Sequence, residues 1–287
     1  MSPPTPFALT PEPSGHAARV DGLDLSRPPD DATLAGIRAA FTRYPVLCFT
    51  GQALDPAGLQ QFAGSLGAFG DDPYVEPLPG HSHVIEVRRE AHETAPIFGS
   101  LWHSDWSFQV TPPSATLLYG AVIPPRGGDT VFANGYAAFE ALSPTMRRLL
   151  GELDGVHSAA PAYGPKGLFS RDDESRSMRI IVSADAERCE AHPVVRRHPE
   201  SGRAALYVNH VYTVGIDGMR VGESRALLEY LFAHMTHEDF VYRHRWEPGS
   251  LLMWDNRCVV HYADGGYEGH RRVMYRSTLA GERPQRA

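Results

Sequence analysis

The chain has 287 residues, of which 42% are hydrophobic and 21% charged, and its formal net charge is −7 at pH 7. These values are typical of a globular protein with ample core, and the negative charge argues against general binding to nucleic acid or to anionic membranes. Three separated cysteines indicate no disulfide framework and fit a reducing, cytoplasmic setting. No apolar run approaches the roughly 20 residues needed to span a bilayer.

The N-terminal stretch MSPPTPFALTPEPSG, residues 1–15, lacks the basic and apolar regions of a signal peptide. Its prolines predict a flexible arm. We expect residues 16–287 to form a single domain, because neither an internal repeat nor a low-complexity linker divides them. Within that domain, residues 71–100 and 155–190 are expected to form a lid or insert region.

In the first half of the chain, helices and strands are expected to be mixed. Apolar residues at helical spacing mark residues 31–44, while a capping Asp55 and a stop at Gly67 bound a second helix. The predicted elements of this half, in chain order, are helix 31–44, strand 46–50, helix 56–66, and strands 83–87, 115–123 and 129–133.

The second half is richer in short strands. A helical pattern over residues 136–153 is interrupted at Ser143-Pro144, and a second helical pattern covers residues 222–235. Further strands are predicted at 205–209, 240–246, 251–254, 259–262 and 271–280. Short strands separated by Gly, Pro and Asn turns favour an antiparallel sandwich or barrel with helices packed outside it. We therefore expect a mainly β protein with flanking helices around a jelly-roll core, whose open mouth can hold a ligand.

The stretch LWHSDWSF places two potential metal ligands, His103 and Asp105, in aromatic surroundings. If this stretch is a strand, the two side chains point to the same face and can meet at one point. Of the 14 histidines, His261 is the best third ligand, because two arginines lie a short distance downstream of it. These arginines, Arg272 and Arg276, share one face of a predicted strand, and inside a barrel each needs an anion.

A 2-His-1-carboxylate triad leaves three positions open on Fe(II), enough for a bidentate 2-oxo acid and dioxygen. Guanidinium groups are well suited to binding carboxylates or sulfonates through paired hydrogen bonds. Metal ligands beside an inward arginine therefore suggest a 2-oxo acid as co-substrate.

With these residues in place, the sequence resembles the taurine dioxygenase family of Fe(II)- and 2-oxoglutarate-dependent oxygenases from about residue 46 to residue 284. Three blocks carry the resemblance. The first is WHSD with the downstream PP and GGDT, the second is HPVVRRHPESGRAALYVN, and the third is WDNRCVVHYADGGYEGHRRVMYRST. The resemblance implies a double-stranded β-helix, which is the jelly-roll fold expected above.

By position, the resemblance implies that His103, Asp105 and His261 bind iron and form the catalytic centre. It also implies that Arg272 and Thr130 hold the distal carboxylate of 2-oxoglutarate. The implied reaction consumes O2 and 2-oxoglutarate, releases succinate and carbon dioxide, and oxidises a small substrate, with hydroxylation as the expected outcome. The presence of a carboxylate at Asp105 argues against halogenation, because related halogenases carry a small residue there.

The substrate end departs from the pattern of taurine dioxygenase. By ungapped counting, the histidine and tyrosine that hold the sulfonate fall near Asp72 and Val75, and a small position after the metal aspartate is Trp106. Neither Asp72 nor Val75 can take over sulfonate binding. We therefore expect taurine to be a poor substrate.

By similar counting, Tyr163 and Tyr212 stand where the family has aromatic substrate contacts, and Arg276 matches the arginine that faces the substrate anion. A pocket walled by Trp106, Tyr163 and Tyr212 suits an aromatic or alicyclic carboxylic acid.

Several alternatives remain at this point. A sulfonate or sulfate-ester dioxygenase, or an oxygenase that desaturates or epoxidises in secondary metabolism, would use the same centre. More remote alternatives are a zinc hydrolase and a non-catalytic jelly-roll protein that senses a small acid. Family members are often dimers or tetramers, so a homo-oligomer is expected.

Overall fold

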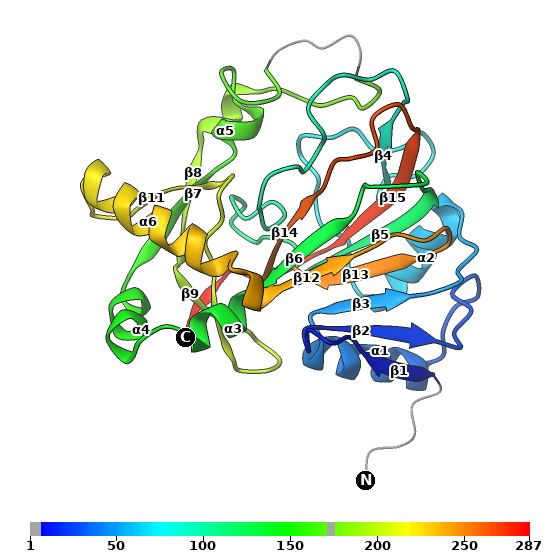
Figure 1. Cartoon of the computed structure of the whole chain (residues 1–287), viewed down its shortest axis with the longest axis horizontal. Coiled ribbons are helices and arrows are strands. Elements are labelled where there is room, and N and C mark those ends of the chain that lie inside the picture. The colour runs from blue at the N-terminus through cyan, green and yellow to red at the C-terminus, as the bar shows by residue number, and fades with distance from the viewer. Residues whose placement is uncertain (1–6, 171–175) are drawn as a thin grey trace.

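The largest sheet has seven strands (Figure 1). The computed structural model describes residues 7–170 and 176–287. Neighbouring strands are antiparallel except for the parallel pair formed by the second and third strands. In spatial order the sheet contains β1 (Ala8–Pro11), β2 (Ala17–Asp21), β3 (Val46–Phe49), β13 (Leu251–Asp255), β5 (Ala115–Val122), β15 (Arg272–Leu279) and β4 (Ile85–Arg89).

A second, three-stranded sheet packs against one face of the large sheet. Its order is β12 (Val241–His244), β6 (Thr130–Asn134) and β14 (Val259–Ala263). Side chains from both sheets meet in one core cluster, with Phe132 and Val259 from the small sheet against Leu118, Trp254 and Met274 from the large one. This arrangement of two packed antiparallel sheets confirms the predicted jelly-roll core.

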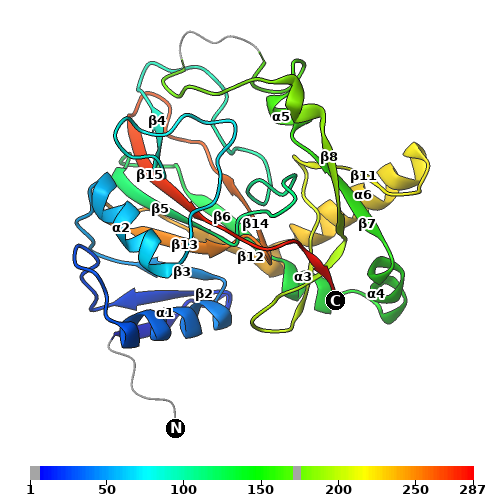
Figure 2. The same ribbon diagram turned by 180° about the vertical axis from the view of Figure 1, so that it is seen from behind.

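Two helices cover the other face of the large sheet, α1 (Asp31–Arg43) and α2 (Pro56–Leu66) (Figure 2). Leu47 and Phe49 of β3 point toward these helices, whereas Val46 and Cys48 point into the sandwich. Because both faces of β3 are covered, its sequence VLCF is apolar throughout instead of alternating.

Outside the sandwich lies a second group of helices and two small sheets. The helices are α3 (Gly135–Glu140), α4 (Pro144–Gly151), α5 (Ala160–Tyr163), α6 (Val221–Met235), η1 (Ala184–Glu187) and η2 (Glu238–Phe240). One sheet contains β11 (Thr213–Ile216), β7 (Asp154–Ser158) and β8 (Cys189–Pro193), and the other contains β10 (Ala204–Leu206), β9 (Val195–Arg197) and β16 (Gln285–Arg286). Within the described residues, no helix is both long and apolar enough to cross a bilayer.

The prediction of a flexible arm over residues 1–15 is partly wrong. Ala8–Pro11, expected to be flexible, forms β1 and pairs along its whole length with β2, and Phe7 is buried in the core beneath the sheet. An edge strand can form here because β2 offers free backbone groups on that side. Residues 1–6 of the arm lie outside the described residues.

The two segments expected to form a lid lie against each other. An isolated β-bridge joins Val75 to Ile180, and the rings of Tyr74 and Tyr163 stack with centroids 4.7 Å apart. Residues 171–175, within the second segment, lie outside the described residues. The aromatic cluster packed between the segments includes Trp106, the residue next to the predicted metal ligand Asp105.

Candidate functional site

The histidines of the predicted triad come from segments that are far apart in sequence. His103 and His261 form an isolated antiparallel bridge, with N–H to O distances of 2.9 and 2.8 Å in the two directions. The expectation that Asp105 follows in the same strand is wrong, because the chain turns immediately after His103. Trp106 adopts a left-handed φ of 47°, and this turn carries the Asp105 carboxylate back toward the histidines.

The three ligand atoms lie within 4.8 Å of one another, and all three side chains are buried. Oδ1 of Asp105 is 3.4 Å from Nε2 of His103 and 3.8 Å from Nε2 of His261. Nδ1 of His103 lies 2.7 Å from the carbonyl oxygen of Leu101, which leaves Nε2 as the acceptor of a neutral ring. Three acceptors facing one another are compatible with a bound cation.

Charge and burial support this protonation pattern. Burial lowers the pKa of His261 well below its usual range, so its imidazole is neutral, as a metal ligand must be. Burial by itself would raise the pKa of Asp105, but the positive charge of the Arg276 guanidinium holds it well below its usual range. The carboxylate is therefore ionised.

A chain of hydrogen bonds orients Asp105 from behind. Its Oδ2 accepts from Oγ1 of Thr116 at 2.6 Å, and Thr116 in turn accepts from Nδ2 of Asn256 at 2.9 Å. Asn256 is held by Nε1 of Trp254 at 3.0 Å. The sequence patterns identified neither Asn256 nor Thr116 as a partner of the metal ligands, although a threonine inside an apolar strand was the available signal. These partners leave Oδ1 of Asp105 facing the histidines.

Arg272 is buried in a cavity that the predicted metal ligands also line, and it has no carboxylate partner among the described residues. Its Nη2 donates to the carbonyl of Gly128 at 3.2 Å, and its Nε has no partner in the described structure. Burial lowers its pKa. Oγ1 of Thr130 accepts from Nε1 of Trp246 at 2.9 Å, so its own proton remains available to an acceptor. A buried guanidinium in this state is suited to an incoming anion.

These groups line one cavity of about 430 Å³. It reaches from the predicted metal ligands to Arg272 and Thr130, so the structure brings the predicted metal and 2-oxoglutarate residues together. Gly128, at φ +72°, passes so close to Arg272 that a Cβ would lie 3.2 Å from its Nε. The close approach and the left-handed φ both favour glycine.

A second cavity, of about 380 Å³, opens on the same His103 and Asp105. Trp106, Tyr163 and Tyr212, the residues expected to contact the substrate, all line it. Burial raises the pKa of both tyrosines, so their hydroxyl groups are neutral. Its other lining residues, which sequence reasoning did not identify, are Phe98, Gly99, Ser100, Leu101, Ala162, Leu168, Phe169 and Val211.

Arg276 is placed differently from its predicted position at the end of the aromatic cavity. It lines the metal cavity and not the aromatic one. Its Nη2 lies 3.0 Å from Oδ1 of Asp105 and 3.7 Å from Oδ1 of Asp72, and its guanidinium lies 4.9 Å from the centre of the Trp106 ring. The chain therefore already supplies two carboxylate partners for this arginine.

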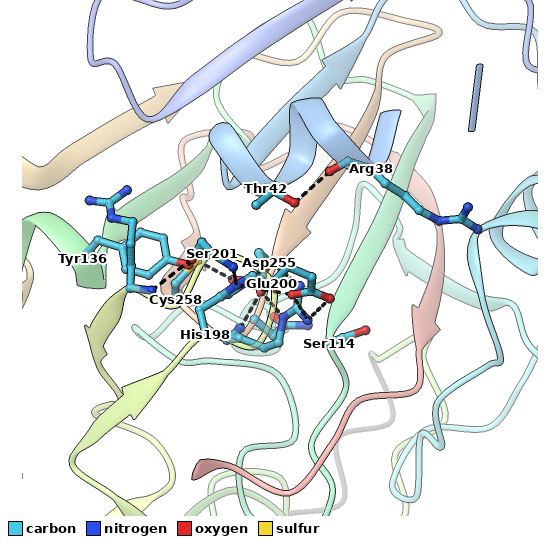
Figure 3. Close-up of polar contacts among 12 residues, drawn as sticks. Arg38, Thr42, Ser114, Tyr136, His198, Glu200, Ser201, Asp255 and Cys258 are labelled. Atoms are coloured by element: carbon cyan, nitrogen blue, oxygen red, sulfur yellow. Dashed lines mark hydrogen bonds and ion pairs between the residues drawn. The ribbon is translucent and has the colours of Figure 1, made fainter. Parts of the chain in front are cut away.

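A second buried cluster of possible metal ligands is formed by His198, Asp255 and Cys258 (Figure 3). Oδ2 of Asp255 lies 2.9 Å from Nε2 of His198 and accepts from Nη2 of Arg257 at 2.7 Å, and Oδ1 accepts from Nε of Arg257 at 2.8 Å. Arg257 also pairs with Glu200 at 2.8 Å. The protein's own donors thus occupy both oxygens of Asp255.

A family model described as "Taurine catabolism dioxygenase TauD, TfdA family" matches residues 7–278. The chain belongs to this family. As a TauD/TfdA-family protein it is a 2-oxoglutarate-dependent dioxygenase of the non-haem iron type.

Two curated relatives illustrate the range of the family. The chain is 35% identical over 269 residues to an alpha-ketoglutarate-dependent sulfate ester dioxygenase of Pseudomonas putida, covering 93% of this chain and 87% of the relative. It is 34% identical over 277 residues to an alpha-ketoglutarate-dependent 2,4-dichlorophenoxyacetate dioxygenase of Cupriavidus pinatubonensis, covering 91% and 93%.

Solved structures agree with the fold. A taurine dioxygenase from Burkholderia xenovorans matches with a TM-score of 0.80 and 32% identity, covering 97% of this chain and 92% of the other. AAD-2 in complex with Mn(II) and N-oxalylglycine matches with a TM-score of 0.78 and 29% identity, covering 97% and 98%.

Proposed function

We propose that this family member uses Fe(II), 2-oxoglutarate and O2 to oxidise a small anionic organic substrate, an aromatic or alicyclic carboxylic acid. Hydroxylation is the expected outcome, with release of succinate and carbon dioxide. The observation that carries the proposal is that the aromatic cavity and the cavity containing Arg272 both open on His103 and Asp105, and that Phe98 and Gly99 also line both. A substrate and a keto-diacid can therefore meet at one centre.

The metal would be held by Nε2 of His103, Oδ1 of Asp105 and Nε2 of His261. These residues fit a divalent cation because they present three possible ligand atoms to one point, from two imidazoles and a buried carboxylate that Thr116 holds in place. When bound, ferrous ion supplies the redox chemistry that couples dioxygen reduction to decarboxylation of 2-oxoglutarate.

For 2-oxoglutarate, Arg272 would bind the distal carboxylate and Thr130 would donate a hydrogen bond to it. The unpaired Nε of Arg272 and the unused hydroxyl proton of Thr130 support these roles. The depth of the cavity then directs the keto acid end toward the metal ligands, and burial of Arg272 strengthens the ion pair.

For the primary substrate, the ring of an aromatic or alicyclic acid would pack between Trp106, Tyr163 and Tyr212. Arg276, which by position was expected to receive the acid group, would lie behind the Trp106 ring with Asp72 3.7 Å from its guanidinium. The relatives named for dichlorophenoxyacetate support an aromatic acid.

A second candidate is a sulfate-ester dioxygenase, which the similarity to the Pseudomonas relative favours. An oxygenase that desaturates or epoxidises is a third outcome of the same centre, and pentalenolactone F synthase of Streptomyces arenae is 28% identical over 276 residues. Membership of the dioxygenase family speaks against a zinc hydrolase or a non-catalytic acid sensor.

We also propose a single catalytic domain that begins at Phe7 and β1 instead of at residue 16, in a cytoplasmic homo-oligomer, a dimer or tetramer. The three cysteines are free, which is consistent with a reducing compartment.

Succinate formation with a panel of substrates tests the proposal. With Fe(II), 2-oxoglutarate and O2, phenoxyacetate or cyclohexanecarboxylate should raise succinate release well above the rate without substrate. Taurine should not. Robust taurine-dependent succinate with release of sulfite would contradict the proposed substrate class, and turnover of a long-chain alkyl sulfate instead of the acids would favour the second candidate.

A further inference from the structure

Asp72 is held firmly beside Arg276. One of its carboxylate oxygens, Oδ1, accepts a short hydrogen bond from Nε1 of Trp106, and the other accepts from Oγ1 of Thr278 at 3.1 Å. Only 14% of its side chain is exposed. Thr278 and Arg276 lie two apart on β15, so they share one strand face and the carboxylate bridges that face to the Trp106 ring.

Arg276 is enclosed on three sides. Asp105 lies 3.0 Å from its Nη2, Asp72 lies 3.7 Å from the same nitrogen, and the Trp106 ring covers the guanidinium at 4.9 Å. Trp106 lines the aromatic cavity, whereas Arg276 lines only the adjoining metal cavity, so the indole ring covers the guanidinium on the side of the aromatic cavity.

Because Asp105 would be committed to the metal, Asp72 is the carboxylate that balances Arg276 before any substrate arrives. A further anion at the same place would be repelled by Asp72 at short range in a site with little solvent. None of the residues described as lining the aromatic cavity is an arginine or lysine. The cavity thus offers neutral hydroxyl groups and rings where an anion would need a cation.

We propose that Asp72 sets the charge selectivity of this dioxygenase by occupying the place at Arg276 that a substrate anion would take. The substrate is then bound through its ring and uncharged groups, and its acid group is not paired with Arg276. This inference rests on the proposed function, since it assumes that the aromatic cavity is the substrate cavity.

The test compares ligands that match in shape and differ by one charge. Phenoxyacetate is paired with phenoxyacetamide, and cyclohexanecarboxylate with its amide. Each is titrated anaerobically into the full chain loaded with Fe(II) and 2-oxoglutarate, and its Kd is read from the perturbation of the metal-to-ligand charge-transfer band. The wild-type protein should bind each acid and amide with Kd values within about threefold of each other.

Asp72→Asn removes the charge while keeping an acceptor for Trp106 and a donor toward Thr278. It should tighten binding of the acids by about tenfold or more and leave the amides within about threefold. Asp72→Ser, which keeps a hydroxyl acceptor, should change the ratio in the same direction. Asp71→Asn is the matched control, because Asp71 is the exposed neighbour, and it should behave as wild type.

The outcomes separate the two proposals. Absence of the band from the wild-type protein would remove the proposed function. If the band is normal, three results would each overturn the role of Asp72. The first is a wild-type preference of tenfold or more for the acids, and the second is an acid-to-amide ratio that neither Asp72 variant changes. The third is a band that no ligand perturbs. Loss of the band in folded Asp72→Asn would also overturn it, since Asp72 would then support the metal centre.

Discussion

Among the described residues, two buried clusters bring histidine and carboxylate side chains close enough to share a metal ion. One contains His103, Asp105 and His261, and the other contains His198, Asp255 and Cys258. They are adjacent in the chain, because Asp255 ends β13 and the next strand, β14, carries His261.

The clusters differ in how donors and acceptors are matched. Around Asp255, Arg257 and His198 donate to both oxygens, and burial raises the pKa of the Cys258 thiol so that it stays protonated. Around Asp105, two imidazole Nε2 atoms face the carboxylate as further acceptors. Ligand types within reach are therefore insufficient to indicate a metal site. The distinguishing feature is that two imidazole Nε2 atoms face the carboxylate as acceptors, with Arg276 as the cation beside it.

The largest expected effect comes from removing one histidine from each cluster. His261→Ala should weaken metal binding by far more than the roughly 10- to 100-fold typical of losing an outer-shell partner. His198→Ala should leave one metal per chain at unchanged affinity. Anaerobic titration calorimetry with Fe(II) measures both, and the comparison fails if the His198 variant, or Cys258→Ser as its companion, loses the metal.

The second cluster should matter for stability instead. Arg257→Ala leaves the buried carboxylate of Asp255 without its main partner and should lower the free energy of unfolding by about 3–5 kcal/mol. Arg225→Ala is the control, because its pair with Glu229 is exposed, and it should leave the free energy of unfolding almost unchanged. Urea denaturation of the metal-free proteins measures both. Equal effects would contradict a structural role for Arg257.

Arg272 extends the comparison, because it is buried like Arg257 but has no carboxylate partner among the described residues. Arg272→Ala should weaken 2-oxoglutarate binding by about 100-fold, in the range expected for a buried charge-assisted contact. In the absence of 2-oxoglutarate, the Arg272→Ala substitution should not lower the free energy of unfolding, because it removes a buried guanidinium that has no carboxylate partner among the described residues. The charge-transfer band reports the affinity, and an unchanged value would refute the role of Arg272.

The smallest expected effect concerns pH. Burial lowers the pKa of His157 to about 3, so below its ordinary value of 6.5 the unfolded chain binds a proton that the folded chain does not. Stability should therefore fall as the pH falls from about 6.5 toward 3. His157→Gln should reduce the slope between pH 6 and 5 by up to about 1.4 kcal/mol per pH unit. The exposed His92→Gln is the control, and equal slopes in both variants would contradict this account.

Much of the site could be predicted because its signals are local. The parity of β15 places Arg272 and Arg276 inside and leaves Arg271 exposed, as expected from alternation. The capping Asp55 and stop at Gly67 bound α2 at Pro56–Leu66 as predicted, and the break at Ser143-Pro144 separates α3 from α4.

The failures arise where distant contacts decide the structure. Strands such as β7 and β11 carry few apolar residues and form through pairing within a three-stranded sheet, where β7 lies between β11 and β8. The turn after His103 depends on a left-handed φ at Trp106. A tryptophan at this position gives no sequence signal for a positive φ. The carboxylate of Asp72 reaches Arg276 across 204 positions of sequence, so no local pattern could show that the two charges are paired.

The central claim is that His103, Asp105 and His261 hold one ferrous ion to which 2-oxoglutarate binds. Anaerobic titration of Fe(II) and 2-oxoglutarate into the wild-type chain, with His103→Ala, His261→Ala and His198→Ala alongside, tests it most directly. We expect the charge-transfer band in the wild type and in His198→Ala, at one iron per chain, and no band in the other two. A band that persists in His261→Ala, or one that disappears in folded His198→Ala, would contradict the claim.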